Sequence, residues 1–263
     1  MKKLIALVLA VVMMMGFACV ASAETSLDAV KAAGVLKVGV DAAFAPMTFK
    51  DETGAYTGYD VALATAVAEK LGVTVEFVEV DWANLAAALA DGTVDVIWSG
   101  MSINAERQAE MTISEAYLES NTVLLVYKEV AGFIEDQKGK KVAVQTGSFS
   151  EELLCEEYSE LSAEMEILGA ADNDAAIADL IAGNVDAVMV DSIYANYQIA
   201  TNEALADYIL IEDLYADLYG IAAAKGNYML IGAIEEAISD LAAEGVIAAI
   251  DAEWFATDAC LIK

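Results

Sequence analysis

Hydrophobic and polar residues alternate in several short segments, and these segments predict β-strands. The alternation is clear at 36–40 and 73–80, and the run V-D-V-I-W at 94–98 combines β-branched and aromatic residues in the same way. Between the first two segments, apolar residues recur at helical spacing up to Gly72, which predicts a helix capped at its start by Asp60. Strands that alternate with helices predict an α/β fold.

The same order of elements occurs twice along the chain. Strands are predicted again at 141–145 and 164–168, each followed by a helix. The segment A-G-N-V-D-A-V-M-V-D at 182–191 then parallels A-D-G-T-V-D-V-I-W-S-G at 90–100, with a helix end at glycine, a Val-Asp pair and a buried strand. The sequence therefore predicts two Rossmann-like lobes built on one plan. We assign the two Val-Asp aspartates, Asp95 and Asp186, to structural roles.

The segment 94–107, V-D-V-I-W-S-G-M-S-I-N-A-E-R, carries informative polar residues. Its strand is predicted to break at 99–100, and Asn104 suits the cap of a following helix. Arg107 would lie in the first turn, where a cation opposes the helix dipole and indicates an anionic partner. With free N–H groups and the hydroxyl of Ser102, this cation suits a carboxylate. A surface arginine without a partner is the alternative.

Asp191 ends the corresponding strand of the second half. Ligands of open α/β sheets bind at the carboxyl ends of strands, so Arg107 from one lobe and Asp191 from the other would face a common cleft. A cleft with one cation and one anion complements a zwitterion. The alternative for Asp191 is an N-cap of the next helix, which this segment alone favours.

Taken together, these segments resemble the extracytoplasmic solute-binding proteins of polar amino-acid ABC importers, solute-binding protein family 3. The resemblance covers nearly all of the chain after residue 23, in the family's order. The matching segments are G-V-L-K-V-G-V-D-A-A-F-A-P-M-T-F (34–49), G-A-Y-T-G-Y-D-V-A-L-A (54–64), 94–107, G-K-K-V-A-V-Q-T-G-S (139–148), G-N-V-D-A-V-M-V-D (183–191), Y-G-I-A-A-A-K (219–225) and W-F (254–255).

The resemblance implies a periplasmic-binding-protein type II architecture, in which two lobes are joined by a two-strand hinge. It implies a discontinuous first lobe at 24–122 and 222–263, and a second lobe at 123–221 that includes the hinge strands. No linker rich in glycine, serine or proline separates the two, which favours short crossovers.

The resemblance also implies how a ligand is held. Arg107, Ser102 and the turn at Ser148 would hold its carboxylate, while Asp191 and the Gly100 carbonyl would hold its ammonium group. The complete predicted ligand-binding set is Asp41, Phe44, Trp82, Ser99, Gly100, Met101, Ser102, Arg107, Gln145, Ser148, Phe149 and Asp191.

The ligand side chain would lie near Asp41, Phe44 and Trp82, with the two aromatic rings on either side of its aliphatic part. Core packing is the alternative for both rings. This set favours a polar or cationic amino acid, Gln145 suits an amide or a guanidinium, and cystine is a further option. Two residues leave the ligand open, because Phe149 and Leu218 depart from the family's pattern. In the family, an acidic residue is common at the position of Leu218.

Residues 1–23 read as a secretory signal peptide, with two lysines, an apolar run and a final Ala-Ser-Ala. Cleavage before Glu24 would leave the protein in a periplasm or at a cell surface. The alternatives are a retained N-terminal anchor and a lipid attached to Cys19. No later segment is long and apolar enough to span a bilayer.

Composition excludes several classes of partner and chemistry. After residue 23 the chain has 11 basic and 43 acidic residues, a net charge of −32, which disfavours nucleic acid as a partner. It has no histidine, and Cys155 and Cys260 match no zinc spacing, so we predict no cofactor and no metal site. These two cysteines either form one disulfide or stay separate thiols.

The sequence predicts a binding protein, not an enzyme. As the resemblance implies, it would bind a free L-amino acid between its lobes and deliver it to the membrane permease of an ABC importer, as a monomer by the family's default. The first alternative is a cyclohexadienyl or arogenate dehydratase-like enzyme, for which Asp41 or Glu106 is the candidate acid or base. The second is a ligand-binding sensor module of a receptor, for which no signalling segment is found.

Overall fold

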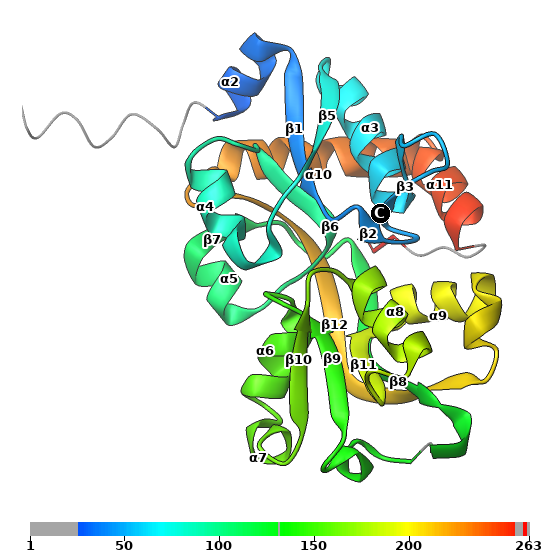
Figure 1. Cartoon of the computed structure of the whole chain (residues 1–263). Coiled ribbons are helices and arrows are strands. Elements are labelled where there is room, and N and C mark those ends of the chain that lie inside the picture. The colour runs from blue at the N-terminus through cyan, green and yellow to red at the C-terminus, as the bar shows by residue number, and fades with distance from the viewer. Residues whose placement is uncertain (1–25, 131, 256–259, 262–263) are drawn as a thin grey trace, which may run out of the picture.

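The computed structural model describes residues 26–130, 132–255 and 260–261. The predicted signal peptide and Cys19 lie outside this part of the chain. Figure 1 shows an α/β protein of two lobes, one above the other, crossed by long strands between them. Within the described residues, no helix combines the length and the apolar character needed to cross a membrane.

Lobe 1 is built on three parallel strands in the order β6-β1-β5. A small antiparallel sheet of three short strands follows β1, in the order β2-β3-β4. The elements of lobe 1 up to the crossing are α2 (Ser26–Ala33), β1 (Val35–Val40), β2 (Ala43–Phe44), β3 (Thr48–Lys50), β4 (Tyr56–Thr57), α3 (Tyr59–Leu71), β5 (Thr74–Glu79), η1 (Trp82–Asn84), α4 (Leu85–Ala90), β6 (Val96–Ser102), α5 (Ala105–Glu110) and β7 (Met111–Ile113).

Lobe 2 repeats this plan with three parallel strands in the order β11-β9-β10. Its elements are η2 (Lys128–Val130), η3 (Ile134–Gln137), β9 (Lys141–Gln145), α6 (Phe149–Cys155), α7 (Ser159–Ser162), β10 (Glu166–Ala170), α8 (Asn173–Ala182), β11 (Ala187–Asp191), α9 (Ser192–Thr201) and η4 (Glu203–Leu205).

The two Val-Asp aspartates make equivalent hydrogen bonds in the two lobes. Asp95 accepts a hydrogen bond from the Lys37 N–H at 2.9 Å, at the start of β1. Asp186 accepts one from the Lys141 N–H at 2.8 Å, at the start of β9. The structural role predicted for both residues and the common plan of the lobes are therefore confirmed.

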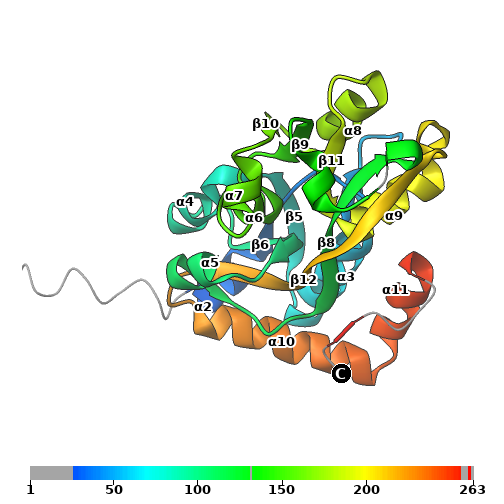
Figure 2. The ribbon, with the colours of Figure 1, turned by 90° about the horizontal axis from the view of Figure 1, so that it is seen from below.

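Two long antiparallel strands, β8 (Leu118–Tyr127) and β12 (Tyr208–Ala224), join the lobes. β12 pairs first with β8 and then with β6, so it runs from lobe 2 into lobe 1. The chain ends on α10 (Tyr228–Ala243) and α11 (Val246–Trp254), and Figure 2 shows α10 lying along lobe 1 beside α3. The two-lobe architecture is confirmed. The exact boundaries of the lobes stay a prediction, since 122/123 and 221/222 divide continuous strands.

The structure corrects two local predictions with one cause. β6 does not break at 99–100 but continues to Ser102, and Asp60 lies inside α3, whose N-cap is Gly58. The Asp60 carboxylate instead accepts hydrogen bonds from the Gly100 N–H at 2.8 Å and the Tyr117 hydroxyl at 2.9 Å. The bond between Gly100 and Asp60 thus gives the Asp60 carboxylate a partner on β6 instead of the start of its own helix. Gly100 adopts φ +57° there, which suits glycine.

Asp60 should make the stability of the protein depend on pH. Burial raises its pKa to about 7, although the hydrogen bonds from Tyr117 and Gly100 act against the rise. The folded state then binds more protons than the unfolded state between pH ~4 and 7, so this contribution to stability is present at low pH and is lost as the pH rises through 7.

We expect Asp60→Asn to reduce the fall in unfolding free energy between pH 5 and pH 8 by about 2–3 kcal/mol, since asparagine does not titrate. Urea unfolding of both proteins at the two pH values measures this. Equal pH dependence in the wild type and the variant would show that Asp60 is ionised throughout.

The cysteines lie in different lobes and are not joined by a disulfide. Cys155 is exposed at the end of α6, whereas Cys260 is buried next to α11, where its N–H donates to Asp251. Of the two predicted options, the structure shows separate side chains.

Candidate ligand site between the lobes

The two lobes contact each other directly across the cleft. Gln145 of β9 donates a hydrogen bond to the Asp41 carboxylate at 2.6 Å. The ring of Phe44 stacks on that of Tyr194 from α9, with centroids 5.7 Å apart and planes within 4°. Asn104 also donates to Glu152 of α6. The structure therefore has the lobes closed on each other.

A small cavity lies between the closed lobes. Side chains from both lobes converge on it, at the carboxyl ends of β1, β6, β9 and β11. The residues that line it are Asp41, Phe44, Trp82, Ser99, Gly100, Ser102, Gln145, Ser148, Phe149, Asn173 and Asp191. Ten of the twelve predicted ligand-binding residues are among them. The structure thus brings these ten together, and their contact with a ligand stays a prediction.

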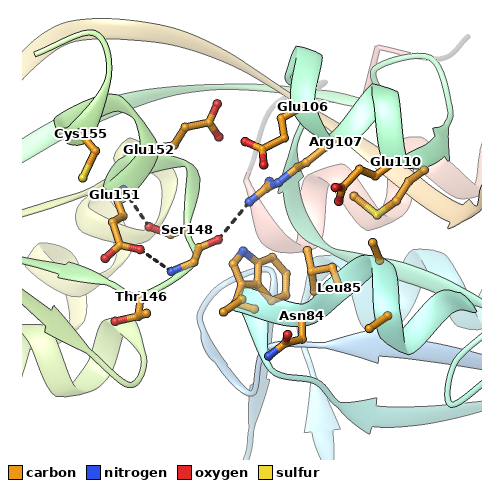
Figure 3. Close-up of a pocket in the computed structure, with 16 residues that line it drawn as sticks. Asn84, Leu85, Glu106, Arg107, Glu110, Thr146, Ser148, Glu151, Glu152 and Cys155 are labelled. Atoms are coloured by element: carbon orange, nitrogen blue, oxygen red, sulfur yellow. Dashed lines mark hydrogen bonds between the residues drawn. The ribbon is translucent and has the colours of Figure 1, made fainter. Parts of the chain in front are cut away.

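Met101 and Arg107 are the two predicted residues that do not line this cavity. Met101 is fully buried in the apolar cluster of lobe 1 that includes Leu85 and Ile97. Arg107 lines a second, wider hollow of about 1190 Å³ on the flank of the cleft. Figure 3 shows its guanidinium beside Glu106 in this hollow, with Glu110 nearby. We take the inner cavity as the candidate site, because the wider hollow opens to solvent and is rimmed by carboxylates.

Arg107 borders the inner cavity through its hydrogen bonds. Asn104 caps α5 as predicted, since its Oδ1 accepts from the Arg107 N–H at 2.7 Å. The guanidinium then donates from Nη1 to the Ser102 carbonyl at 3.0 Å and from Nη2 to the Gly147 carbonyl of lobe 2 at 3.4 Å. Arg107 is 8% exposed, and burial lowers its pKa while the charges of Glu152 and the nearby aspartates oppose that change. It is a buried arginine that joins both lobes, not a surface residue.

The alternative role of Asp191, an N-cap of α9, is not what the structure shows. Asp191 stands at the N-cap position of α9, but its side chain accepts no capping hydrogen bond. Its carboxyl lines the inner cavity instead. Burial and the charge of Asp217 raise the pKa of this carboxyl, while Tyr219 and Arg107 act against the rise.

The turn at Gln145–Ser148 differs from the prediction in one respect. Its N–H groups were expected to bind a carboxylate, but the Gly147 N–H donates to Glu151 at 2.7 Å and the Ser148 N–H to the Gln145 carbonyl at 3.2 Å. Ser148 caps α6 by accepting from the Glu151 N–H. The Glu151 carboxylate therefore binds at this turn, in the place predicted for the carboxylate of a ligand, as Figure 3 shows.

Sequence reasoning missed three residues of the site. Asn173 lines the cavity and donates to Gln145 at 3.0 Å, Tyr194 stacks on Phe44, and Asp217 accepts from the Ser102 hydroxyl at 2.6 Å. Asn173 follows β10 and could have been found by its place after a strand end. Asp217 could have been found from the family's pattern. The acidic residue expected at position 218 of β12 stands one position earlier, at 217. Nothing in the sequence marks Tyr194.

Comparison with known proteins identifies the class to which this fold and cleft belong. A model of the bacterial extracellular solute-binding proteins, family 3, matches residues 36–257, and the chain belongs to this family. The family is extracellular, in agreement with the extracytoplasmic location predicted above.

The individual relatives include binding proteins and one enzyme. The L-cystine-binding protein of Escherichia coli strain K12 is 31% identical over 239 residues, which cover 89% of this chain and 88% of that protein. Cyclohexadienyl dehydratase of Pseudomonas aeruginosa is 32% identical over 195 residues, or 72% and 71% of the two chains. A substrate-binding protein of an ABC uptake transporter from Streptococcus pneumoniae, solved with bound histidine, has a TM-score of 0.87 and 29% identity, covering 91% of this chain and 100% of that one.

Proposed function

We propose that the protein binds one free L-amino acid in the inner cavity and presents it to the permease of an ABC importer. The observation that carries this proposal is the closed cavity between lobes, with the Asp191 carboxyl in its wall and the buried Arg107 guanidinium at its border. These groups complement the ammonium and the carboxylate of an amino acid. Relatives that bind cystine or histidine support the same class of ligand. Ligand would favour the closed arrangement that the permease recognises.

The cavity limits the kind of amino acid. It is small and its walls come from both closed lobes, which suits a single amino acid rather than a peptide. Its wall also carries Asp41, Gln145 and Asn173, together with the aromatic rings of Phe44, Trp82 and Phe149. This combination favours a side chain that is polar or cationic at its tip and aliphatic along its stem.

Asp41 should distinguish cationic from neutral ligands. Burial raises the pKa of its carboxyl, whereas the hydrogen bonds from Ala43 and Gln145 act against that rise. We expect Asp41→Asn to weaken L-arginine binding at least tenfold, the worth of one charged hydrogen bond, and L-glutamine binding less than threefold. Isothermal titration calorimetry with both amino acids measures the two changes. An equal loss for both ligands would contradict a role for Asp41 in selecting charge.

The proposed function is tested by thermal unfolding of residues 24–263, stripped of ligand by unfolding and refolding. An L-amino acid present at a hundredfold its dissociation constant adds ~2.7 kcal/mol of stability, a shift of a few degrees at this size. We expect one or a few polar or cationic L-amino acids to give this shift, and their amides or decarboxylated forms to give none. If no L-amino acid shifts the transition of the folded protein, the proposal is wrong.

A dehydratase is the second candidate, favoured by the similarity to cyclohexadienyl dehydratase. Of the two candidate acids, Asp41 lines the inner cavity, while Glu106 is exposed in the wider hollow. Asp41 alone is therefore placed to act on a bound substrate. Turnover of prephenate by the purified protein, lost in Asp41→Asn, would favour this candidate over pure binding.

We also propose cleavage before Glu24, delivery to a periplasm or cell surface, and a monomeric protein of two lobes with the boundaries predicted from the sequence. Mass spectrometry of the exported protein distinguishes cleavage at Glu24 from a lipid on Cys19. Light scattering gives the oligomeric state.

A further inference from the structure

A pair of aromatic rings joins the two lobes outside the ligand site. Phe49 of β3 in lobe 1 lies against Tyr197 of α9 in lobe 2, with ring centroids 6.1 Å apart and planes tilted by 46°. Neither side chain lines the inner cavity or the wider hollow. The contact of Phe44 with Tyr194 differs in this respect, because Phe44 belongs to the cavity wall. A ligand in the inner cavity would therefore touch neither Phe49 nor Tyr197.

Lobe 1 fixes the position of Phe49 from two sides. In the small sheet, Phe49 pairs with Ala43 of β2 and with Thr57 of β4. Its ring also meets that of Trp254 on α11, edge to face, with centroids 6.1 Å apart and planes at 84°. A ring that is already held by its neighbours loses little conformational entropy when it contacts α9.

α9 connects the second ring to the ligand site. Tyr194 and Tyr197 are three residues apart and lie on the same face of this helix, which Figure 1 shows at the top of lobe 2, facing lobe 1. The Tyr194 hydroxyl donates to Asp174 at 2.6 Å, which holds this face in place. α9 also follows directly on Asp191, which lines the inner cavity. The contact of α9 with lobe 1 is therefore linked to the position of Asp191 in the cavity wall.

The net charge of the lobes opposes their closure. With the lobes divided as predicted, residues 24–122 and 222–263 contain 7 basic and 23 acidic residues, and residues 123–221 contain 4 basic and 20 acidic ones, so each lobe has a net charge of −16. Like charges of this size repel as the lobes approach. Contacts between the lobes that do not involve the ligand offset this repulsion, and they decide how much of the ligand's binding energy closure consumes.

We propose that the contact of Phe49 with Tyr197 forms when the lobes close, and that these two positioning residues thereby set the affinity of the site without touching the ligand. An aromatic pair changes an equilibrium constant by about two- to tenfold beyond the effect of its buried area. The contact is the same whichever amino acid is bound. Its loss should therefore weaken the binding of all ligands by one common factor and leave the selectivity unchanged. This inference rests on the proposed amino-acid site.

Phe49→Leu and Tyr197→Leu each remove one ring and keep an apolar side chain. Isothermal titration calorimetry with L-arginine and L-glutamine measures the affinity of both variants. We expect each variant to bind both amino acids about three- to tenfold more weakly, with the ratio of the two dissociation constants within about twofold of the wild-type ratio. The double variant should lose little more than either single variant, because the second substitution removes a ring that has already lost its partner.

Binding kinetics separate closure from the first encounter with the ligand. We expect stopped-flow fluorescence to show faster dissociation of L-arginine and L-glutamine from both variants, by the same factor as the loss of affinity. Association should stay nearly unchanged, because the ring contact forms only after the ligand has entered the cleft.

Phe77→Leu is the matched control. Phe77 makes a ring contact of nearly the same geometry with Tyr56 inside lobe 1, at 5.7 Å and 47°. This variant should lose stability in urea but bind both amino acids as the wild type does. Wild-type affinity in Phe49→Leu and Tyr197→Leu would show that the contact is the same in the open form, and would overturn the inference.

Two further results would also overturn it. Losses that add in the double variant would show that the two rings act independently of each other. A changed ratio between L-arginine and L-glutamine would show that the rings act on the ligand rather than on closure. A wild-type protein whose thermal unfolding responds to no L-amino acid would refute the proposed function instead.

Discussion

Replacing Arg107 with alanine should weaken the binding of an L-amino acid by about 3–5 kcal/mol, a hundredfold or more. The guanidinium is 8% exposed and is the cation at the border of a site whose other charged groups are aspartates. Loss of a desolvated cation leaves the ligand carboxylate without its charged partner. Arg107→Lys should recover part of the loss, because lysine keeps the charge without the planar pair of donors. Isothermal titration calorimetry measures both variants.

Arg107 also joins the lobes through the Gly147 carbonyl, so its two roles need to be separated. Agmatine, which is arginine without the carboxylate, makes this possible. If Arg107 holds the carboxylate, the wild type prefers L-arginine to agmatine strongly and Arg107→Ala loses most of that preference. If Arg107→Ala weakens the binding of L-arginine and of agmatine equally, Arg107 acts only by joining the closed lobes. Unchanged micromolar binding in Arg107→Ala would remove this residue from the site.

Gly147→Ala should prevent the lobes from closing and weaken amino-acid binding at least a hundredfold. A Cβ atom on Gly147 would lie 2.5 Å from the Ala83 nitrogen and 2.6 Å from its Cα, and both atoms belong to the backbone of the opposite lobe. Backbone cannot move aside as a flexible side chain can. The variant should therefore stay open, and small-angle X-ray scattering should show no decrease in radius of gyration when L-arginine or L-glutamine is added at a concentration that compacts the wild type.

Gly147 also has φ +77°, so alanine there carries a backbone cost of about 1–2 kcal/mol in addition to the contact. Gly183→Ala is the matched control, because Gly183 has φ +74° at the end of α8 and no atom within 4 Å of an added Cβ. Both variants should lose similar stability in urea, but only Gly147→Ala should lose binding. Ligand-induced compaction in Gly147→Ala would show that the lobes tolerate the extra atom.

The sequence alone determined the elements and their order. Alternation of apolar residues marked β1, β5 and β9, and glycines marked the ends of α3 and α8 in the left-handed conformation that glycine adopts readily. These signals are local, because each depends on residues a few positions apart. The repeated Val-Asp pair then predicted the two-lobe plan, and strand ends predicted most of the cavity lining.

Only the tertiary structure decided which partner each polar side chain takes. Asp60 looked like a helix cap but bonds Gly100, 40 residues away, and Ser102 bonds Asp217, 115 residues away. The stacking of Tyr194 on Phe44 likewise exists only because the lobes close. A buried carboxyl or hydroxyl must find a hydrogen-bond partner, and in a closed two-lobe protein that partner is set by packing across the hinge rather than by neighbours in the chain.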